Sequence, residues 1–243
     1  MEKDHLPGQS AEILQINDVS KTFGYRRILS NVHLRLQSGE MTLLLGKNGS
    51  GKTTLMKIIA GLMRPSAGRI LYRGAETSQH PEALRRGIGV ISHFAGVYGE
   101  LTASENLVFF GKLGKSSDLK EKVSRSLERT GLSQFSDLPV KSFSSGMSKR
   151  LNIARLMVLE PEILLLDEPY TGLDYDSIRF FNDYLNVFKA SGGAILMITH
   201  QIETCFDICD KIAILENQSL KRSFSAVDYS REELIQAYHS LTR

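Results

Sequence analysis

The sequence has few cysteines, a weak net charge and no long apolar run. Its two cysteines, Cys205 and Cys209, are too few for a disulfide framework in 243 residues, and they suit a reducing compartment. Their four-residue spacing would put both on one face of a helix. We expect two buried, small apolar side chains there rather than a metal or redox pair.

Other absences narrow the possible partners. The net charge is +3 and no dense block of Lys and Arg occurs, so the composition gives no argument for a nucleic-acid partner. No run approaches the roughly 18 apolar residues that a bilayer crossing needs. Residues 1–11 are polar, contain Pro7 and Gly8, and have no apolar signal region, so we expect a flexible N-terminus. The protein is expected to be soluble, or attached to a membrane through a partner.

A phosphate-binding loop is the strongest motif present. Residues 46–54 read Gly46-Lys47-Asn48-Gly49-Ser50-Gly51-Lys52-Thr53-Thr54, which fits G-x-x-x-x-G-K-[ST]. An apolar strand over 41–45 precedes the loop and a helix over 53–62 follows it, which is the context that the motif requires. The alternative is a glycine-rich turn that happens to precede a helix. Its backbone N–H groups and the helix N-terminus would bind phosphate. We expect Lys52 to contact the β- and γ-phosphates of a nucleoside triphosphate and Thr53 to bind Mg²⁺.

Strands alternate with helices along most of the chain, which indicates an α/β fold with a parallel or mixed sheet. We expect short strands at 13–16, 32–36, 41–45, 69–72, 87–92, 163–166, 194–199 and 212–215, the first of them forming an antiparallel edge. Helices are expected at 53–62, 117–130, 146–159, 175–190 and 201–209, with another opened by a capping box at residues 102–105. We therefore expect a single domain over residues 12–243. Its core comprises residues 12–92 and 156–243, and residues 94–155, approximately, form a helical subdomain.

Two carboxylates follow the apolar strand 163–166. Open α/β sheets bind their ligands at the carboxyl ends of the parallel strands. Asp167 is therefore expected to hold Mg²⁺ opposite Thr53, and Glu168 to act as general base on a water molecule. The alternative is a pair of exposed acids in a turn. His200 follows the strand 194–199 and should reach the same edge, where a γ-phosphate contact is favoured over a purely structural role.

Residues 143–155 read Phe-Ser-Ser-Gly-Met-Ser-Lys-Arg-Leu-Asn-Ile-Ala-Arg. This stretch resembles the signature segment of ATP-binding-cassette (ABC) ATPases, which is L-S-G-G-Q followed by a basic helix ending in I-A-R. The phosphate loop, the signature segment, Asp167-Glu168, Thr171-Gly172-Leu173-Asp174 and His200 also follow the order of that family. The resemblance covers residues 12–220 and implies a nucleotide-binding domain with a P-loop NTPase core.

The resemblance also implies residue roles and partners. Phe23 stands where the family stacks an aromatic ring on adenine, with Tyr25 as the alternative. Two copies would form a head-to-tail homodimer, in which Ser144, Ser145 and Gly146 of one copy contact the γ-phosphate bound by the other. Asp174 would connect the two sites. The dimer would drive integral membrane transporter subunits from the cytoplasmic face of the inner membrane, with Lys52 and His200 stabilising the charge that develops during ATP hydrolysis.

The sequence departs from the family pattern at three positions. Ser145 replaces a usual Gly, which would cost stability if the site needs a positive φ, and Met147 replaces a usual Gln. His93 stands at the position of a Gln that senses Mg²⁺ and the γ-phosphate, and a neutral imidazole could still bind the metal.

His93 lies in a segment, residues 92–102, that resembles the haem-exporter ATPase branch of cytochrome c maturation. We take haem export as the first hypothesis and other ABC-2-type exporters, of drugs, polysaccharides or ions, as the alternative. A non-transport ABC ATPase acting on ribosomes, DNA or Fe–S assembly usually has two cassettes or distinct insertions, which this chain lacks. A nucleotide-binding regulator without turnover is disfavoured because Glu168 and His200 are both present.

Overall fold

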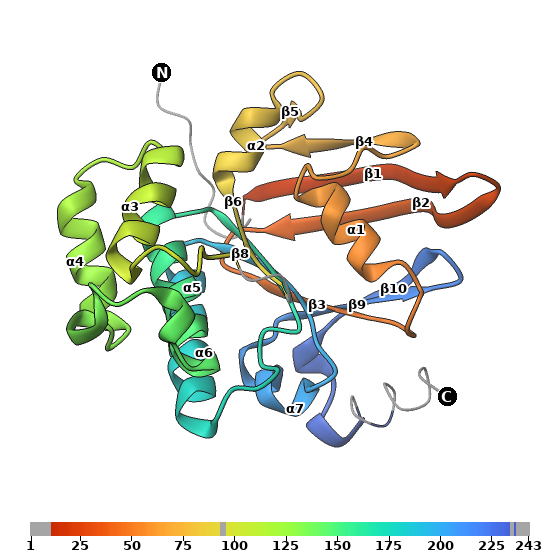
Figure 1. The fold of residues 1–243 in the computed structure, drawn as a ribbon. Helices are drawn as coiled ribbons and strands as arrows, with labels where there is room; N and C mark the ends of the chain where they lie inside the picture. Colours follow the sequence, from red (N-terminus) through yellow and green to blue (C-terminus); the bar gives the residue numbers. More distant parts are fainter. Residues whose placement is uncertain (1–10, 93–95, 234–235, 237–243) are drawn as a thin grey trace, which may run out of the picture.

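A computed structural model describes residues 11–92, 96–233 and 236, and Figure 1 shows how their elements are arranged. Two β-sheets with an α-helix between them form one end of the molecule, and a block of helices (α3, α4 and α5) forms the other. No helix formed by the described residues is long and apolar enough to cross a membrane. The α/β class expected from the sequence is confirmed.

The larger sheet has six strands in the order β10-β9-β3-β8-β7-β6. All neighbours pair in parallel except β9 and β10, which are antiparallel. The strands are β3 (Met41–Leu45), β6 (Ile88–Ile91), β7 (Ile163–Asp167), β8 (Ala194–Ile198), β9 (Lys211–Glu216) and β10 (Ser219–Ser225).

The central strands are apolar apart from the buried Thr42 of β3 and the terminal Asp167 of β7, because helices or strands cover both of their faces. In β7, Ile163 and Leu165 point into a core shared with α1 (Lys52–Ile59) and the second sheet. Leu164 and Leu166 point to the opposite face, into a core shared with α6 (Tyr175–Ala190). Each of these strands therefore contributes side chains to the cores on both faces of the large sheet.

The smaller sheet is antiparallel, in the order β2-β1-β4-β5. Its strands are β1 (Glu12–Phe23), β2 (Arg26–Gln37), β4 (Ala67–Tyr72) and β5 (Ala75–Glu76). The first two are far longer than the short strands expected. Register shifts between β1 and β2 interrupt the alternation of apolar residues, so the sequence pattern reveals only fragments of each strand.

A helical block packs around a third core cluster. It consists of α3 (Ala103–Leu113), α4 (Leu119–Arg129) and α5 (Ser145–Leu159). The helix α5 also contributes Ile153 and Leu156 to the core beneath the large sheet, so it belongs to both packing units. The predicted division after residue 155 falls inside this helix.

The structure corrects the helix expected at 201–209. Only α7 (Ile202–Cys205) is α-helical; a 3₁₀ turn (Phe206–Ile208) follows, and Cys209 is already extended because the chain enters β9 at Lys211. Both cysteines are buried, as expected, but they do not share a helix face. The remaining elements are α2 (Pro81–Gly87), which the sequence did not reveal, and 3₁₀ turns at Ser133–Phe135, Val140–Ser142 and Ala226–Asp228.

The predicted capping box of α3 is present and gives a test of the helical block. The hydroxyl of Thr102 accepts from the Glu105 N–H at 3.1 Å, and the Glu105 carboxylate accepts from the Thr102 N–H at 2.8 Å. We expect Thr102→Ala to lower the free energy of unfolding by about 1 kcal/mol in a urea titration, because one helix-terminal N–H loses its acceptor. The matched control is Ser104→Ala in the same turn, whose hydroxyl caps nothing; an equal loss in both variants would contradict the assignment.

Candidate active site

The phosphate loop connects the end of β3 to the first residue of α1, as its sequence context predicts. Its backbone takes positive φ values at Gly46 (156°) and Gly51 (107°). A Cβ on Gly46 would lie 2.3 Å from the Leu215 carbonyl oxygen, and one on Gly51 would lie 2.8 Å from Leu29 Cδ2. Glycine is therefore required at both positions by conformation and by space.

The ammonium group of Lys52 is held inside this loop. Its Nζ donates to the carbonyl oxygens of Gly46, at 2.7 Å, and Lys47, at 3.0 Å. Burial lowers the pKa of Lys52, while the nearby carboxylates of Glu168 and Asp167 act in the opposite direction. The loop thus presents a fixed cation and the N-terminus of α1 to the same space, which suits a polyphosphate.

Asp167, the last residue of β7, lies beside the start of α1. The Thr53 hydroxyl donates to Asp167 Oδ2 at 3.3 Å. A hydroxyl and a carboxylate are hard oxygen donors, which Mg²⁺ takes together with water and substrate phosphates rather than an all-protein cage. This pair therefore fits the predicted Mg²⁺ site, although no group of three or more His, Cys, Asp or Glu suited to a metal occurs in the described residues.

Glu168 and His200 meet at the ends of neighbouring strands β7 and β8. His200 Nε2 lies 3.3 Å from Glu168 Oε1, and the His200 backbone N–H donates to Glu168 Oε2 at 3.2 Å. Glu168 itself has φ 51°, and its N–H donates to the Ile198 carbonyl at 2.8 Å. The carboxylate is 13% exposed and the imidazole 49%, so both face a semi-enclosed space.

A cavity of about 420 Å³ joins these groups. The predicted residues that line it are Asn48, Gly49, Gly51, Lys52, Thr53, Thr54, Asp167, Glu168 and His200. Gly46, Lys47 and Ser50 line an adjoining cavity of about 300 Å³. Arg26 lines both, and the sequence analysis missed it, although the basic pair Arg26-Arg27 directly after the aromatic segment was a usable signal.

The predicted adenine platform lies at the end of β1. The ring of Phe23 is 48% exposed, and Lys21 Nζ sits 5.0 Å from its centroid while donating to the Arg64 carbonyl at 2.8 Å. A cation over one face leaves the ring in a fixed position. Neither Phe23 nor Tyr25 lines the two cavities at the phosphate loop, but Tyr25 is fully exposed whereas the Phe23 ring is half-buried against Lys21, so Phe23 remains the better candidate.

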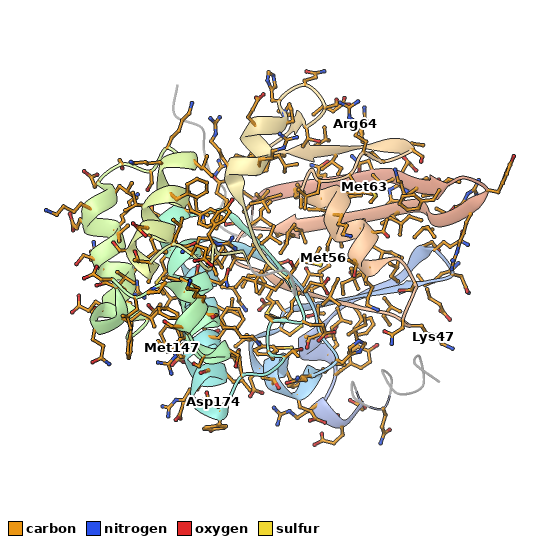
Figure 2. The ribbon with its side chains drawn as sticks, viewed as in Figure 1. Lys47, Met56, Met63, Arg64, Met147 and Asp174 are labelled. Atoms are coloured by element: carbon orange, nitrogen blue, oxygen red, sulfur yellow. The ribbon has the colours of Figure 1, made fainter. Side chains whose placement is uncertain are left out.

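The signature segment lies away from the phosphate loop of its own chain. In Figure 2, Met147 and Asp174 lie on one side of the molecule and Lys47 on the other. Ser144 caps α5 by accepting from the Met147 N–H at 3.2 Å, and Gly146 follows in the first turn. Ser145 lines neither phosphate cavity; it lines a third cavity, of about 260 Å³, that Glu168 also borders.

The structure gives different outcomes for Ser145, Asp174 and His93. Ser145 is the first residue of α5 and has no positive φ, so the cost feared for a non-glycine residue does not arise. Asp174 caps α6 by accepting from the Ser177 N–H at 2.8 Å, and these hydrogen bonds to Ser177 lower the pKa of Asp174. His93 lies outside the described residues, so its predicted metal role stays a prediction.

Comparison with known proteins agrees with this geometry. Residues 29–171 match the family model described as "ABC transporter". The chain is similar to the "Nod factor export ATP-binding protein I" of Ralstonia nicotianae, with 32% identity over 86% of the chain and 65% of that protein. It is 32% identical to the "ABC transporter ATP-binding protein NatA" of Bacillus subtilis, over 84% and 86% of the two chains. A solved structure described as the ATP binding subunit of an ABC transporter superimposes with a TM-score of 0.87 at 31% identity, covering 95% of this chain and all of that one.

The crowding at Gly46 predicts a large effect of one added methyl group. We expect Gly46→Ala to lower the free energy of unfolding by about 3 kcal/mol, because the clash with Leu215 adds to the cost of the positive φ. Binding of a fluorescent ATP analogue should weaken in parallel. The control is Gly74→Ala, which also has a positive φ (78°) but open space around it and should cost only about 1 kcal/mol. Equal losses in urea unfolding would show that the contact is unimportant.

Proposed function

Because the chain belongs to the ABC transporter family of ATP-binding subunits, we propose that it hydrolyses ATP to drive a membrane transporter. The observation that carries this proposal is the meeting of Thr53, Asp167, Glu168 and His200 around one cavity at the carboxyl edge of the large sheet. These are the groups that phosphoryl transfer needs: an anion cradle, a metal position and a base for water.

The distances support distinct roles for the polar side chains. Glu168, half-enclosed and free of any metal role, is placed to accept a proton from the attacking water. His200, in contact with it, orients that carboxylate and faces the γ-phosphate, while Lys52 stabilises charge on the phosphoryl oxygens. Mg²⁺, when bound by Thr53 and Asp167, would neutralise phosphate charge.

We further propose that two copies form each complete site. The signature segment lies on the other side of the molecule from its own Lys47, and Ser145 lines neither cavity at the phosphate loop, which supports a contribution from a second copy. A second copy packed head to tail would bring the N-terminus of its α5, with Ser144, Ser145 and Gly146, to that position. Asp174, exposed beside the signature segment, would lie at the junction of the two copies.

The membrane partner is proposed to dock near residues 94–110, at the cytoplasmic face of the inner membrane. Tyr98 and Phe109 are 52% and 37% exposed there, and their rings meet edge to face with centroids 5.1 Å apart. Exposed, mutually packed aromatic rings are suited to burial against a partner's helix.

We propose an exporter as the transporter and treat its cargo as a separate question. A relative with an export name, the Nod factor export protein, supports the broader ABC-2-type hypothesis. The haem hypothesis depends on the segment around His93 alone. We therefore place a general exporter ahead of a haem exporter, which reverses the order that the sequence suggested.

The assignment of Glu168 as base predicts a specific defect. We expect Glu168→Gln to lower ATP turnover by about 10²–10⁴-fold, because the amide cannot accept the proton, while ATP binding is retained. Size-exclusion chromatography with Mg·ATP should show this variant as a trapped dimer and the wild type as mostly monomer. Glu82→Gln, at an exposed position of α2, is the control and should match the wild type. Unchanged turnover in Glu168→Gln would refute the assigned base.

The hypotheses on the cargo predict different membrane proteins that should co-purify with this chain. We expect affinity purification from detergent-solubilised membranes to recover integral membrane proteins in stoichiometric amount. An absorption spectrum of that complex without a haem Soret band, together with ATPase activity, would support the general exporter. A haem-containing complex would support the cytochrome c branch, and recovery of ribosomal RNA without membrane proteins would contradict transport.

A further inference from the structure

Arg155, on the inner side of α5, connects this helix to the chain that leaves β6. One guanidinium nitrogen, Nη2, donates to the Val90 carbonyl at 2.7 Å, and the other, Nη1, donates to the Gly96 carbonyl at 2.8 Å. These two carbonyls stand on either side of residues 91–95. A single side chain therefore fixes both flanks of the segment in which the sequence places His93.

The guanidinium is also stacked on α3. Its carbon lies 4.9 Å from the centroid of the Phe110 ring, and Phe110 packs in turn on Tyr98 with centroids 5.9 Å apart. Arg155 thus contacts α5, α3 and the exit of β6 at once, and the aromatic rings extend this connection to the exposed Tyr98.

This arrangement is costly, because no ion pair among the described residues neutralises the guanidinium charge. Within the described part of the chain no carboxylate pairs with Arg155, and its buried Nε has no hydrogen-bond acceptor. Burial lowers the pKa of Arg155 for the same reason. An apolar residue of similar length would fill this space without that penalty, so packing alone does not account for an arginine here.

We propose that Arg155 is a positioning residue that couples the signature helix to the segment between β6 and α3. It would make the positions of Ser144 and Ser145, at the start of α5, and the backbone positions of Val90 and Gly96 depend on each other. When a second copy's phosphates draw the start of α5 toward them, the guanidinium would carry that displacement to both carbonyls. The inference rests on the proposed ATPase function and adds the residue through which the two regions communicate.

The partner on the other side of the contact is equally specific. A Cβ on Gly96 would lie 2.2 Å from Arg155 Nη1, so a side chain there would displace the guanidinium from its position at the carbonyl. The hydrogen bond between Arg155 and the Gly96 carbonyl can therefore be removed by either of two substitutions: Arg155→Met in α5 or Gly96→Ala in the loop. Neither change touches the phosphate loop.

A double-mutant cycle tests the coupling. We expect each single variant to lower kcat about tenfold, which corresponds to about 1.4 kcal/mol, while ATP affinity stays within about twofold. The double variant should fall no further than the lower single one, because both changes remove the same contact. Arg129→Met, at an exposed position of α4, is the matched control and should keep wild-type kcat.

Hydrogen exchange provides a readout that does not need turnover. Backbone amides in peptides spanning residues 88–100 should exchange faster in Arg155→Met and Gly96→Ala than in Arg129→Met, with the phosphate-loop peptide unchanged. Arg155→Lys should stay close to Arg155→Met, since one ammonium cannot replace the two-pronged guanidinium.

The proposal is overturned if the effects of the two single variants on kcat add in the double variant, or if kcat and exchange stay at wild-type values. Loss of ATP affinity in step with kcat would also overturn it, since that points to general unfolding. Gly96→Ala decides the matter if Arg155→Met does not fold, because the loop change leaves α5 intact. An inactive wild type would refute the proposed function, while the exchange comparison would still test the contact.

Discussion

The active-site geometry depends on the parallel alignment of β3, β7 and β8. Parallel strands end at the same edge, so the phosphate loop after β3, the carboxylates after Leu166 and the imidazole after β8 converge without any contact between their sequences. The alignment is fixed because each strand is buried on both faces, and a shift by one residue would exchange the two cores. The packing that fixes the alignment of the strands therefore also fixes the positions of the polar groups at their carboxyl ends.

The sequence predicted best what local pattern determines. The buried strands, the phosphate loop and the capping box of α3 follow from short runs of residues, and the structure confirms them. The long strands β1 and β2 were underestimated because bulges hide their period, and the helix after His200 was overestimated because the start of β9 cuts it short. The contacts of Arg155 were missed for another reason: they join residues distant in sequence, such as Gly96 with Arg155, and no local pattern encodes such a pair.

The unusual signature segment illustrates how much of this site is made by the backbone. The start of α5 offers its N–H groups whichever side chains follow, and Ser144 closes the first turn by accepting from Met147. Met147 replaces a hydrogen-bonding side chain, yet its backbone N–H still makes the cap. Sequence variation in such a motif thus removes side-chain contacts while preserving the helix N-terminus that we propose to meet the γ-phosphate.

The left-handed backbone of Glu168 has a consequence for the evolution of this chain. A non-glycine residue at φ 51° carries a conformational cost of about 1–2 kcal/mol, which glycine would largely avoid. Replacement by glycine would therefore favour a more stable molecule, but it would remove the carboxylate that meets His200. If Glu168 is the proposed base, selection for heat resistance and selection for turnover act in opposite directions at this single position, so laboratory evolution for stability alone should tend to lose this carboxylate.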